Sequence, residues 1–278
     1  MKKIVIRALS GAVYVGLIVA AILCAEGRFF PLLCTGFALM AVFEFDRLVS
    51  AHSPRAAIVR IFDVILCVIP PLYLAVPVMG PAADIYITTF AVAMLYAAVI
   101  MIRIIYTLYS REVHPVSSLA YTFLAMAYIA LPLALAAMMS DYSMRYLLLL
   151  VFVMIWINDT GAFLTGTAFG RHRLYERLSP KKSWEGFFGG LVFSAATGFV
   201  AALVLPQYLS FLNPLVGALL GVAVSVLATW GDLFESLLKR TAGVKDSGHI
   251  MPGHGGILDR IDSFLFVIPP LAILIFFI

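Results

Sequence analysis

The chain has 278 residues, of which 63% are hydrophobic and only 12% are charged, and its mean hydropathy is +1.04. Soluble domains carry about 25% charged residues, so the composition excludes an ordinary soluble domain and indicates an integral membrane protein. The net charge of +4 is too small to indicate nucleic-acid binding, because Lys and Arg in a membrane protein first serve to orient its loops. The three cysteines lie in apolar runs, which favours small hydrophobes over disulfides or thiolate metal ligands.

Apolar runs separated by charged breaks predict nine spanning helices, because one span needs roughly 20 mostly apolar residues. We expect them at residues 4–24, 29–45, 61–79, 85–102, 119–139, 146–164, 187–205, 214–230 and 261–278. The first run is interpreted as a retained span and not as a signal peptide. The fold expected is therefore an all-α, polytopic integral membrane protein. It forms a single transmembrane domain over 1–278, with N-terminal spans in 1–140 and a catalytic half in 141–278.

The distribution of basic residues predicts the orientation of these spans. All but Arg28 and Arg145 of the 19 Lys and Arg residues fall on one side in the nine-span arrangement, which places the N-terminus inside and the C-terminus outside. Two long, polar inside loops, residues 165–186 and 231–260, are expected to carry the function at the cytoplasmic face. We expect a bacterial inner membrane as the location.

Residues 225–262 concentrate charge in a chain that is otherwise poor in it. Apolar and charged residues alternate at helical spacing over 231–243, which predicts an amphipathic helix along the membrane surface with Gly243 as its C-cap. A glycine-rich segment then suggests a loop whose backbone N–H groups bind phosphate, although H-G-G also suits an ordinary tight turn. Its members are Gly248, His249, Pro252, Gly253, His254, Gly255 and Gly256.

Three acids are predicted to reach the same depth at the inside face. Asp232 ends the eighth span, Asp259 precedes the ninth, and Asp159 lies near the inside end of the sixth. Acids near the membrane are costly and are functional candidates by default, and carboxylate oxygens suit Mg²⁺. The alternative is that these acids pair with Arg171, Arg240 or Arg260.

The segment 170–186 places Lys181 and Lys182 beside Ser179, Ser183 and Glu185. Such a loop could clamp phosphates. A positive-inside loop attracted to anionic lipid would have the same composition, so the charge pattern leaves both interpretations open.

The remaining acids of the N-terminal half have simpler interpretations. Glu44 and Asp46 end the second span, and we expect them to snorkel to the interface. Asp63 is expected to pair locally with Arg60. The sequence contains no G-x-x-x-x-G-K-[ST], H-E-x-x-H or G-x-S-x-G pattern, which disfavours a P-loop ATPase, a zinc protease and a serine-nucleophile hydrolase.

Two blocks of the C-terminal half resemble the signature of the phosphatidate cytidylyltransferases, or CDP-diacylglycerol synthases. The first runs from Ser236 through Lys239-Arg240, Lys245-Asp246, Gly248, Met251-Pro252, His254-Gly255-Gly256 and Asp259-Arg260 to Asp262. The second runs from Asn158-Asp159-Thr160 through Gly166 and Gly170 to Ser179-Pro180-Lys181-Lys182-Ser183-Trp184-Glu185-Gly186. Ser183 stands where Thr is commoner and Phe163 where Tyr is expected, and neither change removes a ligand.

The resemblance implies the transfer of a cytidylyl group from CTP to phosphatidate with Mg²⁺, giving CDP-diacylglycerol and pyrophosphate. It implies Asp232 and Asp259 as metal ligands. The catalytic set would be Asp232, Asp259, Lys239, Arg240 and Asp246. Substrate would be bound by Lys181, Lys182, Ser179, Glu185, Lys245, His254, Gly255, Gly256, Arg260 and Asp159. A second cation and a homodimer are left open, and the expected partners are CTP, phosphatidate and membrane lipid.

Two other functions stay open at this point. A transporter of cations or phosphate-bearing substrates could use the same acids, but it would need polar groups near the membrane midplane as well. A related membrane cytidylyltransferase acting on a different lipid phosphate would share the same residues.

Overall fold

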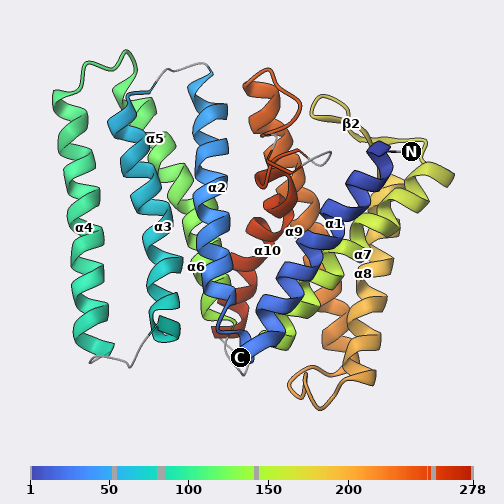
Figure 1. Cartoon of the computed structure of the whole chain (residues 1–278). Helices are drawn as coiled ribbons and strands as arrows, with labels where there is room; N and C mark the ends of the chain where they lie inside the picture. Colours follow the sequence, from blue (N-terminus) through green and yellow to red (C-terminus); the bar gives the residue numbers. More distant parts are fainter. Residues whose placement is uncertain are drawn as a thin grey trace. The chain divides into compact units, whose positions relative to one another are not determined.

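A computed structural model describes residues 2–51, 55–79, 85–140, 144–248, 250–251 and 255–276. These residues form helices joined by short connections and one small β-hairpin (Figure 1), which confirms the all-α prediction. The chain divides into two compact units. Unit 1 comprises Met1–Tyr142 with Thr241–Arg260, and unit 2 comprises Ser143–Arg240 with Ile261–Ile278.

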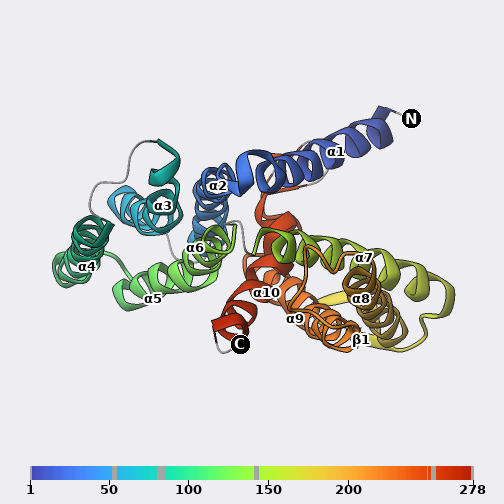
Figure 2. The same ribbon diagram turned by 90° about the horizontal axis from the view of Figure 1, so that it is seen from below.

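Unit 1 contains the helices of the N-terminal half. They are α1 (Lys2–Leu23), the 3₁₀ turn η1 (Cys24–Gly27), α2 (Phe30–Ser50), α3 (Ala57–Met79), α4 (Ile85–Tyr109), α5 (Pro115–Ala125), the π-helical turn η2 (Met126–Ala130) and α6 (Leu131–Met138). Helix α2 packs against α3 and α6, and α3 packs against α4 (Figure 1 and Figure 2). The last part of the unit is the segment 241–260, which returns to α2 from the C-terminal half of the sequence.

Unit 2 contains the elements that carry most of the predicted site. They are α7 (Arg145–Phe169), β1 (Arg173–Tyr175), β2 (Ser179–Ser183), α8 (Trp184–Val204), α9 (Pro214–Thr241) and, from residue 261 onward, α10 (Leu258–Phe276). Strands β1 and β2 pair antiparallel, with Arg173 opposite Ser183 and Tyr175 opposite Ser179. Helices α7 and α8 pack against each other over an extensive interface.

Seven described segments are long and apolar enough to cross a membrane. They are Ala8–Gly27, Ala57–Ala75, Thr88–Tyr109, Pro115–Met138, Arg145–Phe169, Trp184–Val204 and Pro214–Thr241. Each coincides with a predicted span, and the protein is an integral membrane protein. The second and ninth predicted spans are helical as α2 and α10 but contain charged residues, so the total of nine crossings stays a prediction.

The prediction of a separate amphipathic surface helix after the eighth span is wrong. Residues 231–241 are the last turns of α9, and their polar residues Glu235 and Ser236 are buried. The charged residues at helical spacing therefore extend the spanning helix itself. Gly243 has φ of 69°, which is the left-handed conformation expected of a residue just beyond a helix end.

Small residues allow α8 and α9 to pack with their backbones in contact. A Cβ atom on Gly198 would overlap the carbonyl group of Gly217, and a Cβ atom on Gly217 would overlap that of Gly198. On α8, Gly190, Ser194 and Gly198 follow one another at four-residue spacing and are buried. Helices in membranes use such small residues for close approach, so α8 packs closely against the first turns of α9.

Five residues of the fifth predicted span form a π-helical turn, Met126–Ala130, and Pro132 follows it within α6. Proline lacks the amide donor and its ring collides with the carbonyl four residues earlier. A wider turn relieves that collision. The helix therefore accommodates this proline by a local change of helix type.

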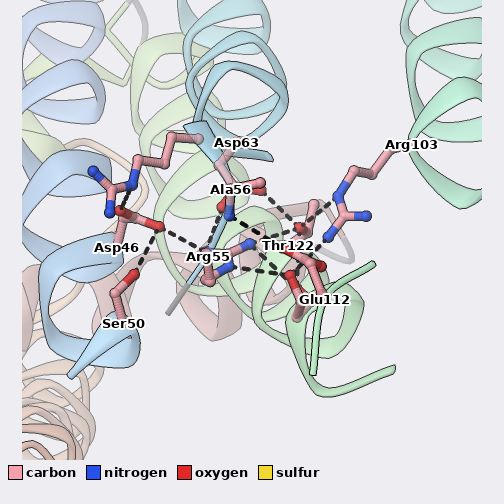
Figure 3. Close-up of polar contacts among 10 residues, drawn as sticks. Asp46, Ser50, Arg55, Ala56, Asp63, Arg103, Glu112 and Thr122 are labelled. Carbon is pink, nitrogen blue, oxygen red and sulfur yellow. Dashed lines mark hydrogen bonds and ion pairs between the residues drawn. The ribbon is translucent and has the colours of Figure 1, made fainter. Parts of the chain in front are cut away.

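A buried cluster of ions joins four helices of unit 1 (Figure 3). The Arg55 guanidinium lies 2.9 Å from the Asp46 carboxylate and 2.7 Å from that of Asp63, and the side chains of Arg55 and Asp63 are fully buried. Arg103, also buried, donates to Thr122 and to Ser118. Charges of both signs compensate one another here, as buried ions require.

This cluster corrects two predictions made from the sequence. Asp46 does not snorkel to the interface, because it is buried between Arg55 and Arg60, the latter at 2.9 Å. Asp63 pairs with Arg55 and not with Arg60. The segment between α2 and α3 carries Arg55 into the unit, and a reading by sequence proximity alone could not anticipate this.

Candidate functional site

Three carboxylates gather where α9 and α10 approach each other in unit 2. Ligand atoms of Asp232, Glu235 and Asp262 lie within 4.8 Å of one another. Glu235 and Asp262 are buried, and Asp232 is half-buried. Gly231 explains the approach, because a Cβ atom there would lie 2.7 Å from the Asp262 carbonyl oxygen. We call these three residues the acidic cluster.

Two lysines face the acidic cluster. The Lys182 ammonium lies 2.5 Å from the Asp232 carboxylate, and Lys239 forms an ion pair with Glu235 one helical turn away. Asp159 adds a further repulsive interaction with Asp262. Acids therefore outnumber the two paired lysines, and such a site favours binding of a cation. Oxygen ligands at this separation suit Mg²⁺ by their chemistry.

The β-hairpin places Lys182 against the acidic cluster. Ser183 ends β2 and accepts a hydrogen bond from the Gly186 amide at 3.1 Å, so it is the N-cap of α8. Glu185 accepts from the Arg171 amide at 3.1 Å and lies 2.6 Å from Nδ1 of His172. Through these contacts Glu185 links the end of the hairpin segment to its beginning.

A cavity of about 300 Å³ in unit 2 adjoins the hairpin. Lys181 and Lys182 line one part of it, and Phe163, Phe187 and Thr229 line the rest, with other residues of α7 and α8. It combines cationic groups with apolar walls. A ligand with a phosphate and an apolar portion would match that lining.

The other site residues predicted in unit 2 lie around this centre. Asp159 is exposed on α7, beside Asn158, whose amide group accepts a hydrogen bond from the Ser225 hydroxyl at 2.6 Å. Arg240 donates to the Leu178 carbonyl oxygen at 3.4 Å. Ser179 lies in β2 opposite Tyr175. The structure thus places Lys182 and Lys239 at the acidic cluster with Asp232, while Ser179 lies within the hairpin and Arg240 contacts its turn.

The predicted glycine-rich loop belongs to unit 1, and its described ends lie side by side. Met251 and Gly255 form a β-bridge, and Gly255 has φ of 85°. Asp259 Oδ2 accepts from the Ser247 amide at 3.0 Å and from the Gly256 amide at 2.8 Å. The predicted ligand Asp259 therefore organises the loop in this unit.

Other predicted residues of the loop segment are placed as follows. Lys245 and Asp246 are exposed and line a pocket of about 390 Å³ with residues of α2. Arg260 is exposed, and its carbonyl oxygen accepts from the Tyr14 hydroxyl at 3.0 Å. His254, predicted to bind nucleotide, lies outside the described residues.

Sequence reasoning missed three residues that the structure places at these centres. Glu235 and Asp262 complete the acidic cluster. The spacing of Asp232 and Glu235 could have indicated the first of them, because residues three apart lie on one helix face. Glu44 was expected at the interface, which is wrong: it is buried and accepts hydrogen bonds from the loop ends. No local pattern links Glu44 to a segment 200 residues away.

An acidic cluster faced by lysines, in a helical membrane protein, is an arrangement suited to binding a cation and phosphate groups. The sequence matches the cytidylyltransferase family over residues 5–278, and the chain belongs to that family.

Curated relatives give a more specific comparison. A phosphatidate cytidylyltransferase of Staphylococcus epidermidis is 38% identical over 170 residues, covering 61% of this chain and 64% of the relative. One of Staphylococcus aureus is 41% identical over 172 residues, with the same coverage of 61% and 64%. One of Staphylococcus haemolyticus is 38% identical over 179 residues, covering 64% and 67%. The match thus spans less than two thirds of the length of the S. epidermidis and S. aureus relatives.

Proposed function

We propose that this protein is a Mg²⁺-dependent phosphatidate cytidylyltransferase that converts CTP and phosphatidate into CDP-diacylglycerol and pyrophosphate. The observation that carries the proposal is the acidic cluster with its lysine partners, in a chain of the cytidylyltransferase family. The relatives' activity supports the choice of phosphatidate as acceptor.

The reaction joins two anions, so charge neutralisation is its main requirement. A phosphate oxygen of phosphatidate attacks the α-phosphorus of CTP, and the bond from that phosphorus to the pyrophosphate oxygen breaks. Because a phosphate monoester has its second pKa near 6, the attacking oxygen is already ionised and needs no strong base. The chain must therefore hold both phosphates and stabilise the charge that develops on them.

The residues divide these tasks between them. Asp232, Glu235 and Asp262 would hold Mg²⁺, which supplies positive charge beside the reacting phosphate when it is bound. Lys182 and Lys181 would hold substrate phosphate at the cavity beside the hairpin. Lys239 keeps the buried Glu235 compensated.

The remaining assignments complete this proposal. We retain Asp259 as a second metal ligand, and Arg240, Asp246, Lys245, Arg260, Asp159 and the Gly255-Gly256 backbone as groups that orient substrate. Glu185 and Ser179 would act through the hairpin. The proposed location is a bacterial inner membrane with the N-terminus and the site in the cytoplasm and the C-terminus outside, because the basic residues favour that orientation.

The decisive experiment supplies purified protein in lipid nanodiscs with CTP labelled at the α-phosphate, Mg²⁺ and a panel of lipid phosphates. We expect label in a CDP-lipid with phosphatidate, together with pyrophosphate release. If only another lipid phosphate becomes labelled, that lipid and not phosphatidate is the acceptor. Flux of substrate across the membrane of sealed vesicles without CTP consumption would show that the protein is a transporter and not this enzyme.

A further inference from the structure

A single carboxylate on α2 binds the two ends of the glycine-rich loop. Glu44 Oε1 accepts from the Ile257 amide at 3.0 Å, and Oε2 accepts from the Leu258 amide at 2.9 Å. The Ser247 hydroxyl lies 2.9 Å from Glu44 Oε2 and 3.0 Å from Asp259 Oδ2. One serine proton can therefore serve either acid, and this couples the two carboxylates.

The position of Glu44 matches an unsatisfied part of α10. The first amides of a helix have no partner within the helix, and Leu258 begins α10. A negative charge is favourable at that end. Glu44 thus supplies the cap for α10 from a helix more than 200 residues earlier, while only 4% of it is exposed.

Two glycines leave room for this carboxylate. A Cβ atom on Gly248 would overlap Glu44, and a Cβ atom on Gly256 would overlap both Glu44 and the Ser247 hydroxyl. The glycines of the loop therefore admit the side chain of α2, in addition to any close approach of a substrate phosphate.

Burial of a charged carboxylate is costly unless hydrogen bonds compensate it. An apolar residue of the same volume would leave the Ile257 and Leu258 amides without an acceptor, so the acid is required at the loop ends. We propose that Glu44 is a positioning residue that holds the loop ends, residues 244–248 and 255–258, in the conformation that presents Lys245 to substrate phosphate. The proposal rests on the cytidylyltransferase function proposed above.

The test replaces Glu44 by Gln, which preserves size but exchanges one acceptor oxygen for a donor. We expect the Glu44→Gln variant to fold, to lose at least tenfold in kcat/KM, and to show faster amide hydrogen exchange at Ile257 and Leu258. Ser247→Ala should lower kcat/KM less, and the double variant should lose less than the product of the two single losses, because both act through one network. Glu26→Gln is the matched control, since Glu26 is exposed on unit 1 and pairs only loosely with Arg28 at 3.7 Å.

The outcomes separate this proposal from the enzyme assignment. Normal kcat/KM with a lowered melting temperature in Glu44→Gln would reduce Glu44 to a structural acid and overturn the positioning role. Unchanged exchange at Ile257 and Leu258 would overturn it as well. If the unsubstituted protein makes no CDP-lipid but the variant still loosens these amides, the loop role stands and the proposed reaction falls.

The pocket beside the loop ends carries a second inference, about its ligand. It is about 390 Å³ in volume and lies between the end of α2 and residues 242–247. Arg47 and Lys245 contribute two positive charges to its lining, and Asp246 contributes one negative charge. Its remaining wall includes apolar atoms of Leu48 and Val244.

The combination of charges favours one ligand class. Two cations suit a phosphate, and a carboxylate beside them suits a hydroxyl or amino donor on the same ligand. A nucleotide offers both, whereas a phosphatidate headgroup offers phosphate without a hydroxyl or amino group. The geometry points to Arg47 as a contact for the phosphates of CTP, again on the basis of the proposed function.

Equilibrium binding of CTP and steady-state kinetics test this contact together. Arg47→Ala should weaken CTP binding and raise KM for CTP about tenfold, with KM for phosphatidate within twofold, and Arg47→Lys should recover part of the loss. Arg28→Ala is the control for loss of a surface arginine. A rise in KM for phosphatidate alone would assign the pocket to the lipid headgroup, and unchanged constants for both substrates would overturn the contact. CTP binding without any turnover in the unsubstituted protein would separate this site from the proposed reaction.

Discussion

Lys182 and Asp232 are joined by an ion pair of 2.5 Å that connects strand β2 to the acidic end of α9. The ammonium group thereby neutralises part of the negative charge that would attract a divalent cation. Lys182 is 28% exposed in its side chain and Asp232 38%, so both partners are open to ligands. Lys182 therefore has two roles. Without a bound cation it neutralises Asp232, and once a cation binds Asp232 it can pair with a substrate phosphate.

The first prediction concerns Lys182→Met. Loss of the ammonium should lower the Mg²⁺ concentration needed for half-maximal activity about tenfold, equivalent to ~1.4 kcal/mol, while KM for the substrates rises. Titration of activity with Mg²⁺ at fixed CTP measures both effects. Lys181→Met should raise KM without lowering the Mg²⁺ requirement, because Asp232 pairs with Lys182. A higher Mg²⁺ requirement in Lys182→Met would contradict this account.

The second prediction compares the carboxylates one by one. Asp232→Asn and Asp262→Asn should each lower kcat by about 10²- to 10³-fold, since a bound cation provides several kcal/mol of transition-state stabilisation. Glu235→Gln should do the same if it is a ligand. Asp259→Asn tests the ligand assigned by resemblance. The Mg²⁺ dependence of each variant distinguishes ligands from loop residues, because only a lost ligand raises the Mg²⁺ requirement.

The third prediction concerns Glu185, which links the two ends of the hairpin segment. Glu185→Ala removes the acceptor for the Arg171 amide and the partner of His172. The hairpin should open more often, so trypsin should cut after Arg173 and Arg177 several-fold faster than in the unsubstituted protein. Mass spectrometry of short digests identifies these cuts. Equal cleavage rates in the two proteins would show that Ser183 and the strand pairing hold the hairpin without Glu185.

Hydrophobic periodicity predicted the helices well because each of them is decided locally. Runs of about 20 apolar residues can satisfy their backbone only as helices in a membrane, and α1 and α8 follow the predicted spans closely. The charged end of α9 was harder to interpret. Its alternation of apolar and charged residues fits a surface helix as well as an extended spanning helix, and only the packing of Gly231 against α10 shows which one forms.

Long-range polar contacts were beyond the reach of the sequence. Arg55 was counted as an inside-loop charge, yet it is buried between two acids of neighbouring helices. Glu44 looked like a helix-end residue, yet its partners lie beyond residue 246. In both cases the position of the charged side chain depends on its desolvation and on partners supplied by tertiary packing. Neither produces a periodic pattern in the sequence. The basic segment 170–186 and Asp232 were predicted as site residues because their charge is concentrated in short segments.

The fourth prediction tests the close contact between α8 and α9. Gly217→Ala should destabilise unit 2 by about 1–3 kcal/mol, the usual cost of overpacking, because the added methyl group overlaps the Gly198 carbonyl. Denaturation in mixed micelles measures the loss. Gly36→Ala is the matched control within a helix, since a Cβ atom there meets nothing within 4 Å. Equal stability of the two variants would mean that α8 and α9 pack less closely than described.

The fifth prediction concerns the ion cluster of unit 1. Arg55→Ala leaves Asp63 buried without its closest cation, and removal of one partner from a buried pair costs about 3–5 kcal/mol. Arg60→Ala should cost about 0–1 kcal/mol, because its side chain is 49% exposed and Asp46 keeps Arg55 as a second partner. Unfolding of both variants in the same micelles gives the comparison. Asp63→Asn combined with Arg55→Met should recover part of the loss in Arg55→Ala, since it removes both charges together. If Arg55→Ala unfolds like Arg60→Ala, then water reaches Asp63 and the cluster is not a buried clamp of α2, α3, α4 and α5.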